Sequence, residues 1–266
     1  MTTFKNILLI GASGSIGSLV FEALQQEPSF NLTVLQRHSS KAKLPSYLKF
    51  RMVDAAITAG VRRYVPSEYG LNNLRPDAQA LNSVFHDKGK VQEYLRTKAE
   101  EGAIEWMSIS CGMWLKWSMA HDFLGMHVKE RRDDGEGYFS YTTEENTAVG
   151  LVRALKKPEG TKNTNIYLSD FAITQKQLLE AIEKAQGVKY KTEIVNSQVL
   201  IEEKQEAMRK GDQTAVAALI ETGFVTGRFG GHLEKEPGRI MNEELGLPNR
   251  TLDEVVVGAL RSLGQL

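Results

Sequence analysis

The chain has 266 residues, of which 41% are hydrophobic and 25% are charged, a balance typical of a globular protein with one large domain or a domain and a smaller lobe. Lysine plus arginine and aspartate plus glutamate both number 33, so the formal net charge is zero and does not favour a nucleic-acid partner. Cys111 is the single cysteine, which excludes an internal disulfide and a cysteine-rich metal site, and no apolar run approaches membrane-spanning length.

The chain opens with an apolar stretch, a glycine-rich turn and a helical pattern. Residues 6–10 are typical of a short buried parallel strand, and apolar residues recur at helical spacing over 16–24. Between them, Gly11 allows a sharp turn, Gly14 lets a diphosphate approach the backbone, and Gly17 lets the helix pack close to the sheet. The helix N-terminus suits phosphates, so we predict a dinucleotide site; a turn without a ligand is the alternative. The predicted contacts are Gly11, Ser13, Gly14, Ser15, Ile16 and Gly17.

The end of the second predicted strand, residues 32–36, indicates which dinucleotide binds. An acidic residue at this point would bind a ribose 2′-hydroxyl, but the chain has Arg37, whose guanidinium suits a 2′-phosphate. Lys41 adds positive charge nearby. We therefore predict NADPH rather than NADH as the cofactor, with a solvated basic loop as the alternative.

The next stretch leads to a second predicted ligand-binding edge. In order, we predict a third strand over 47–52, a helix over 53–59, a strand over 63–65 and a polar loop over 72–80. The strand over 63–65 finishes in Pro66-Ser67-Glu68-Tyr69-Gly70, a polar tip at the carboxyl edge of the sheet, where open α/β sheets bind their ligands. Ser67 is therefore a predicted cofactor contact.

The remaining elements complete a doubly wound Rossmann-type parallel sheet with a smaller C-terminal substrate lobe. We predict a helix from Ser83 or Asp87 to Lys98, a strand over 105–110, a helix over 143–155, a strand over 165–168, and helices ending at 186, 210 and 263. Thr174 with Gln177 and Thr251 with Glu254 form capping boxes. The four glycines of 223–231 predict a loop beside a cleft. We divide the chain into a nucleotide-binding portion, 1–137, and a substrate-side portion, 138–266.

Two lysines compete for the role of a catalytic group. Tyr94 and Lys98 have the Y-x-x-x-K spacing of short-chain dehydrogenases, but their helix should descend from the carboxyl edge of the sheet. At about 1.5 Å per residue, Tyr94 would lie about 9 Å and Lys98 about 15 Å below Lys88. Lys88 stands at the top of that helix, where it would act as a general acid or base toward a phenol or carbonyl oxygen. The alternative for Lys88 is a solvated lysine at a helix start. The histidines lack ligand spacing, so we predict no metal site.

Four separated motifs resemble the NmrA-like and isoflavone reductase-like family of atypical short-chain dehydrogenases. They are the turn Gly11–Gly17, Arg37, the run from Ala59 to Gly70, and Phe85-His86-Asp87-Lys88. The resemblance implies NADPH bound through the turn and the arginine, and hydride transfer to a phenylpropanoid-type or related aromatic substrate. It also implies that Lys88 is the catalytic lysine.

The chain departs from the family pattern near residues 50–54. The family has a helix, a strand and a loop where Phe50 here runs almost directly into the later helix, so a crossover step of roughly 30 or more residues is absent. The missing strand would lie beside the first strand, where the cofactor binds. Its loss should open the centre of the sheet unless another strand takes its place.

Three hypotheses for the function remain open at this point. The first is a cytosolic NADPH-dependent reductase of a small aromatic molecule, without nucleic-acid or membrane partners. The second is a non-catalytic NADP(H) sensor that binds a protein partner, and the third is a remnant without cofactor. Trp114 and Trp117, after the strand over 105–110, line a substrate pocket in the first hypothesis, with core packing as the alternative.

Overall fold

The computed structural model describes residues 3–35, 47–121, 123, 137–192 and 194–266. Its elements in chain order are β1 (Asn6–Ile10), α1 (Ser15–Gln25), β2 (Asn31–Leu35), α2 (Tyr47–Thr58), β3 (Arg63–Tyr64), α3 (Pro76–Leu81), α4 (Ser83–Glu100), β4 (Glu105–Ser110), α5 (Leu115–Ala120), β5 (Phe139–Tyr141), α6 (Glu144–Leu155), β6 (Thr164–Tyr167), β7 (Phe171–Ile173), α7 (Gln175–Gln186), α8 (Ser197–Arg209), α9 (Thr214–Val225), the short 3₁₀ turn η1 (Leu233–Lys235) and α10 (Leu252–Ser262). Within these ranges the strands form three sheets, β1–β2, β3–β4–β6 and β5–β7.

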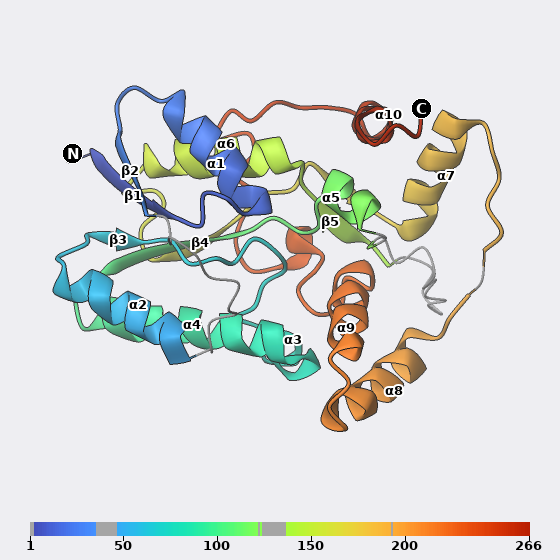
Figure 1. The fold of residues 1–266 in the computed structure, drawn as a ribbon, viewed down its shortest axis with the longest axis horizontal. Helices are drawn as coiled ribbons and strands as arrows, with labels where there is room; N and C mark the ends of the chain where they lie inside the picture. The colour runs from blue at the N-terminus through green and yellow to red at the C-terminus, as the bar shows by residue number, and fades with distance from the viewer. Residues whose placement is uncertain (1–2, 36–46, 122, 124–136, 193) are drawn as a thin grey trace.

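The parallel strands lie between two layers of helices (Figure 1). Helices α1 and α6 lie on one side of the strands, and α2, α3 and α4 on the other. Strand β4 is apolar on both faces of its sheet because each face packs on a layer of helices. Met107 and Ile109 join the core under α1 and α6, whereas Trp106 joins the core with α2 and α4. This alternation confirms the predicted doubly wound, Rossmann-type arrangement.

The parallel strands are split into two sheets. Strand β1 pairs with β2 from Asn6 opposite Asn31 to Ile10 opposite Leu35, and β4 pairs with both β3 and β6. No strand in the described part of the chain joins the β1–β2 pair to β3. The predicted gap is therefore present, and one face of the β1–β2 pair is left uncovered, with Leu8 56% and Leu35 55% exposed. The opposite face packs on α1 and α6 through the shared apolar core.

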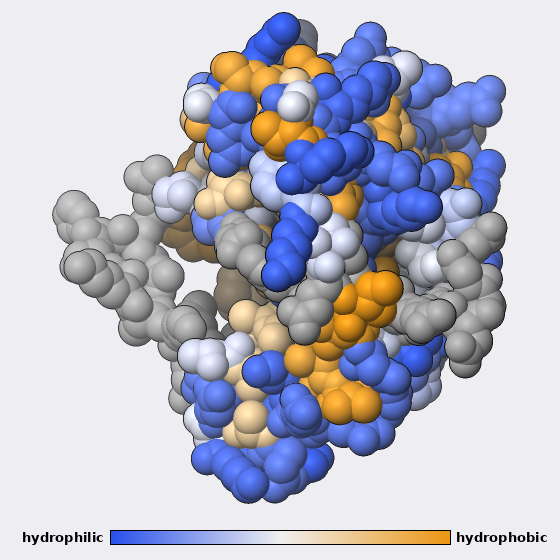
Figure 2. Space-filling view, turned by 90° about the vertical axis from the view of Figure 1, so that its right-hand side faces the viewer, coloured by the Kyte–Doolittle hydropathy of each residue, from blue (hydrophilic) through white to orange (hydrophobic). Residues whose placement is uncertain are grey.

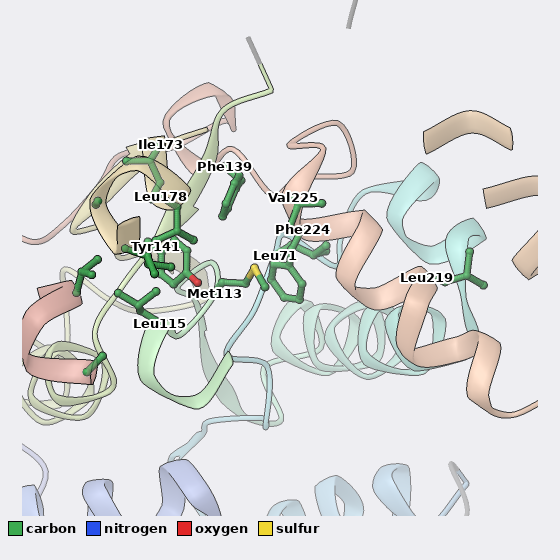
Figure 3. Packing of buried hydrophobic residues seen from close by; sticks show 14 of the residues in the cluster. Leu71, Met113, Leu115, Phe139, Tyr141, Ile173, Leu178, Leu219, Phe224 and Val225 are labelled. Carbon is green, nitrogen blue, oxygen red and sulfur yellow. The ribbon is translucent and has the colours of Figure 1, made fainter. Parts of the chain in front are cut away.

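A second apolar core lies under the C-terminal elements. It gathers around the antiparallel pair β5–β7 and the helices α7, α9 and α10, and Figure 3 shows Phe139, Tyr141 and Leu178 among its members. Leu71, Leu81 and Phe85, from the first half of the chain, pack in the same core. The division at residue 137 stays a prediction.

Three expected elements differ from the structure. The strand expected over 47–52 is wrong, because these residues open α2: Phe50, Val53 and Ile57 recur at helical spacing and pack in the core shared with α4. Part of the loop expected over 72–80 forms α3, which begins with Pro76 at its first turn.

The glycine-rich loop expected over 223–231 begins only after α9 ends at Val225. A Cβ at Gly223 would lie 2.7 Å from Leu81 and 2.9 Å from Phe85, so this glycine permits close helix packing instead of a turn. The predicted capping boxes of α7 and α10 are both present.

Viewed from the side of α7 and α8, the surface is largely hydrophilic with separate apolar areas (Figure 2). The segment that joins these two helices carries three exposed large hydrophobic residues, Val188, Tyr190 and Ile194, and Val199 is exposed on the first turn of α8. Among the described residues, no helix combines the length and apolar character needed to cross a lipid bilayer.

Candidate functional site

The turn between β1 and α1 has the geometry that a diphosphate site requires. Gly11 adopts φ +88°, a conformation that favours glycine, and its carbonyl accepts a hydrogen bond from the Gly14 N–H at 3.0 Å. A Cβ at Gly17 would lie 2.0 Å from the Gly11 oxygen, so the helix start can fold over the strand end only with glycine there. Gly14 is the N-cap of α1, with no side chain in the way of an approaching anion. The turn therefore fits a dinucleotide diphosphate.

The other residues predicted to contact the cofactor lie around this turn or outside the described part. Ser13 and Ser15 are exposed, and the Ile16 side chain packs toward the core, which leaves its backbone N–H at the first turn of α1. Arg37 and Lys41 lie outside the described residues. Their contact with a 2′-phosphate stays a prediction.

Lys88 lies at the carboxyl edge of the second sheet, on the second turn of α4. Its ammonium donates to two backbone carbonyls of the tip that follows β3, to Ser67 O at 2.9 Å and to Glu68 O at 2.5 Å. The structure thus brings together Lys88 and Ser67, two residues that the sequence singled out. Ser67 contributes its carbonyl to this contact, and its exposed side chain remains a predicted cofactor contact.

The tip also holds a buried carboxylate that sequence reasoning missed. Glu68 is only 2% exposed, and one carboxylate oxygen accepts from Asn73 Nδ2 and from Gln92 Nε2, each at 2.7 Å. Gln92 is fully buried and accepts in turn from Ser108 Oγ on β4 at 2.9 Å. Gln92 lies 24 residues after Glu68, so no local pattern in the sequence indicated this contact.

Aromatic and sulfur side chains surround the strand ends near Lys88. Tyr69 follows Glu68 in a left-handed conformation, φ 45°, that residues other than glycine rarely adopt, and its ring lies 6.4 Å from that of Trp114. Trp114 donates to Thr147 Oγ1 at 3.1 Å. Burial raises the pKa of the Cys111 thiol to about 12, against the opposing effects of Thr147 and of the Lys88 charge. Cys111 is therefore a neutral, buried thiol under the site.

A second carboxyl group lies close to this cluster, at the start of α6. Glu144 is 9% exposed, and its Oε1 accepts from the Trp117 backbone N–H at 2.7 Å. Burial raises the pKa of Glu144, with its backbone contacts acting in the opposite direction. The charge of Glu144 also raises the pKa of Cys111, a smaller effect than burial. Trp117 itself stacks on His121 and meets the ring of Phe123, so it packs within its own segment.

The competing pair, Tyr94 and Lys98, is engaged elsewhere. Tyr94 donates to Asp54 Oδ1 of α2 at 2.5 Å, and Lys98 pairs with Glu101 at 2.7 Å. The hydrogen bond to Asp54 raises the pKa of Tyr94, which is the opposite of what a Y-x-x-x-K pair needs. These contacts lie against α2, whereas Lys88 contacts the tip that follows β3.

An open cleft of about 710 Å³ lies between the start of α3 and strand β6. Its walls include Asn72, Arg75, Asp77, Asn165, Tyr167 and Glu236, and neither Lys88 nor the glycine turn contributes to it. The chemistry of Lys88 and of the turn, rather than the size of this cleft, defines the candidate site. Within the described ranges, no group of three or more His, Cys, Asp or Glu side chains is placed to bind a metal ion.

Fold and site geometry together define a Rossmann-type protein with a glycine turn at β1–α1 and a lysine at the carboxyl edge. Residues 48–238 match the model of the NmrA-like family, which is more than half of the chain, so the protein belongs to that family.

Curated relatives come from filamentous fungi. The chain is 26% identical over 296 positions to Oxidoreductase aprR of Aspergillus flavus, in an alignment that covers 96% of this chain and 98% of the relative. Since 96% of 266 residues is about 255, about 40 of the 296 positions are gaps in this chain, a total comparable to the roughly 30 or more residues of a crossover step. Oxidoreductase poxI of Penicillium oxalicum is 22% identical over 294 positions, covering 94% of this chain and 92% of the relative.

Solved structures support the same fold. A crystal structure of isoflavone reductase superposes with a TM-score of 0.74 at 18% identity and covers 96% of this chain and 99% of its own. AtPrR2 with NADP+ and (+)pinoresinol gives 0.73 at 15% identity, covering 97% and 99%. A ternary complex of leucoanthocyanidin reductase from Vitis vinifera gives 0.66 at 15% identity, covering 96% and 99%. At these identities the likeness concerns the fold.

Proposed function

We propose that this protein is an NADPH-dependent oxidoreductase of the isoflavone reductase-like type, which transfers hydride to a small aromatic substrate. The observation that carries the proposal is Lys88, whose ammonium is held on the Ser67 and Glu68 carbonyls at the carboxyl edge. The names of fungal relatives and of reductases with NADP+ or NADPH support it. We expect the cytosol as its compartment.

In this proposal, some residues bind the coenzyme and Lys88 transfers the proton. The turn Gly11–Gly17 would hold the diphosphate and Arg37 the 2′-phosphate, and the bound coenzyme would supply the hydride. Lys88 would give its proton to the substrate oxygen while hydride adds to the neighbouring electrophilic carbon. In that step one C–H and one O–H bond form, the C–O π bond breaks, and the lysine is left neutral until solvent reprotonates it. The neutral thiol of Cys111 and the rings of Tyr69 and Trp114 would exclude water from the site.

A matched pair of lysine variants tests the proposal. Lys90 lies two residues after Lys88 on α4 and pairs on the surface with Glu93 at 2.8 Å. We expect Lys88→Ala to keep its affinity for NADPH within about threefold but to lose at least about 100-fold in turnover of a phenylpropanoid-type substrate panel. Lys90→Ala should keep both. Turnover that is unchanged in Lys88→Ala would remove this lysine from the mechanism.

One observation favours a second candidate function, a non-catalytic NADP(H) sensor with a protein partner. The split beside β1 removes a strand, and the loop after it, from the place where a coenzyme would lie. A sensor would bind NADPH with no turnover on any panel member, and Lys88→Ala would leave that binding intact. The reductase proposal requires turnover in the native protein.

A further inference from the structure

The loop that holds the Lys88 ammonium is itself held by a buried carboxylate. Lys88 donates to the main-chain oxygens of Ser67 and Glu68, so its direction depends on where these two carbonyls point. The Glu68 side chain turns inward, is 2% exposed, and accepts from the amides of Asn73 and Gln92. Burying a carboxylate costs free energy unless hydrogen-bond donors surround it. Movement of the loop would break the hydrogen bonds of Glu68, so these bonds restrain the loop.

The donors tie the loop to the element that carries Lys88. Gln92 follows Lys88 by four residues on α4, so one helix presents the ammonium and also anchors the loop that receives it. Ser108 of β4 holds the other end of the Gln92 amide at 2.9 Å, which fixes the direction in which that amide donates.

The residue next to Lys88 shows how closely the loop lies on the helix. A Cβ at Gly89 would come within 2.4 Å of the Asn73 carbonyl oxygen, so only glycine allows this approach. Asn73 is also one of the two donors to Glu68. The loop from Ser67 to Asn73 is thus clamped to the first turns of α4 by backbone packing at Gly89 and by side-chain hydrogen bonds at Glu68.

We propose that Glu68 is a positioning residue for Lys88, whose buried carboxylate fixes the loop carbonyls that hold and aim the ammonium. The effect of Glu68 on catalysis rests on the proposed function, because it follows only if Lys88 is the proton donor. Its structural content, the restraint of the ammonium by Glu68, is independent of cofactor and substrate.

The test compares how fast an amine-acylating reagent modifies Lys88 and Lys90 in the unliganded protein, with peptide mass spectrometry as the readout. Lys90 is the internal standard because its side chain is 46% exposed on the same helix. Glu68→Ala removes the acceptor of both amides, and we expect the Lys88 to Lys90 ratio to rise about threefold or more as the loop loosens. Glu68→Gln keeps a carbonyl oxygen for the same two donors, so its ratio should stay within about twofold of the native value.

Two further variants keep the test decisive. Glu183→Gln changes another buried carboxylate, on α7, which accepts from the Tyr190 backbone N–H at 2.9 Å, and it should leave the ratio unchanged. If Glu68→Ala does not fold, Asn73→Ala removes one of the two donors and should give an intermediate ratio. A native ratio in Glu68→Ala or Asn73→Ala overturns the proposal, and so does a Glu68→Gln ratio as high as that of Glu68→Ala.

The outcome separates this inference from the proposed function. Failure to bind NADPH would end the reductase proposal and leave the labelling result standing. If the protein does turn over a substrate, Glu68→Ala should lower kcat about tenfold or more with little change in NADPH affinity, and Glu68→Gln should recover most of kcat. Equal losses of kcat in both variants would contradict positioning by hydrogen bonds.

Discussion

Ile10 and Leu35 end the two strands of the first sheet as directly paired residues, and their side chains are 48% and 55% exposed. In a complete doubly wound sheet, parallel strands are covered on both faces and read as continuous apolar runs. Here β1 has the apolar sequence of a strand that is buried on both faces, but Leu8 and Ile10 on one of its faces are exposed. Within the described residues, the apolar contacts of the β1–α1–β2 unit therefore lie on its other face, against α6 and the strands β4 and β6.

This one-sided attachment predicts uneven local stability. Amides of β1 and β2 should exchange with deuterium faster than those of β4, which is bonded on both edges and buried at Met107 and Ile109. Saturating NADPH should protect β1 and β2 selectively, because the coenzyme would bind to their carboxyl ends. Peptide-resolved hydrogen exchange measures both effects. Equal protection of β1 and β4 without coenzyme would contradict the split sheet.

The two faces of the same unit should respond differently to truncation. Leu8→Ala should cost less than about 1 kcal/mol of unfolding free energy, because Leu8 is 56% exposed. Leu24→Ala, on the covered side at 2% exposure, should cost about 2–5 kcal/mol. Urea denaturation followed by tryptophan fluorescence measures the difference. Equal losses would mean that the exposed face is covered in solution.

Adding one methyl group at Gly17 tests the proposed diphosphate site. A Cβ at Gly17 would lie 2.0 Å from the Gly11 oxygen, so Gly17→Ala should lower stability by about 1–3 kcal/mol and weaken NADPH binding at least about tenfold. Gly258→Ala, in the middle of α10 with nothing within 4 Å of the added atom, should raise stability by about 0.4–1 kcal/mol. Isothermal titration and urea melts give both quantities. Normal coenzyme affinity in Gly17→Ala would rule out the proposed diphosphate site.

Glu144 predicts how stability depends on pH. Burial raises the pKa of this carboxyl group above its unfolded value, so between the two values the folded state binds more protons and stability falls as pH rises. Glu144→Gln does not titrate, and its side-chain carbonyl can still accept from Trp117. The variant should therefore gain stability relative to the native protein as the pH rises from about 4.5, the ordinary pKa of a glutamate, towards neutral. Glu145→Gln, exposed in the same turn, is the matched control, and a difference that stays constant over this range would contradict the assignment.

Much of the fold was predictable from the sequence where local signals agreed with tertiary packing. The capping residues Thr174 and Thr251 marked helix starts correctly because a side-chain cap acts within one turn of chain. The strand expected over 47–52 was wrong. The helical spacing of Phe50, Val53 and Ile57 stabilises a helix here because these side chains pack in the core shared with α4.

The candidate site was predictable in part. Lys88 and the glycine turn carry local motifs, but the role of Glu68 depends on amides that lie 5 and 24 residues further along the chain. Gly223 was assigned to a loop because glycine usually marks turns, whereas here it makes room for Leu81 and Phe85. Such contacts between distant segments leave no local pattern in the sequence.

Direct titration of the native protein with NADPH and with NADH, followed by quenching of tryptophan fluorescence, tests the central claim. The proposed 2′-phosphate contact at Arg37 predicts saturable binding of NADPH that is at least about tenfold tighter than that of NADH. Quenching by neither coenzyme, confirmed by calorimetry, would contradict the account, and equal affinities would contradict the role of Arg37.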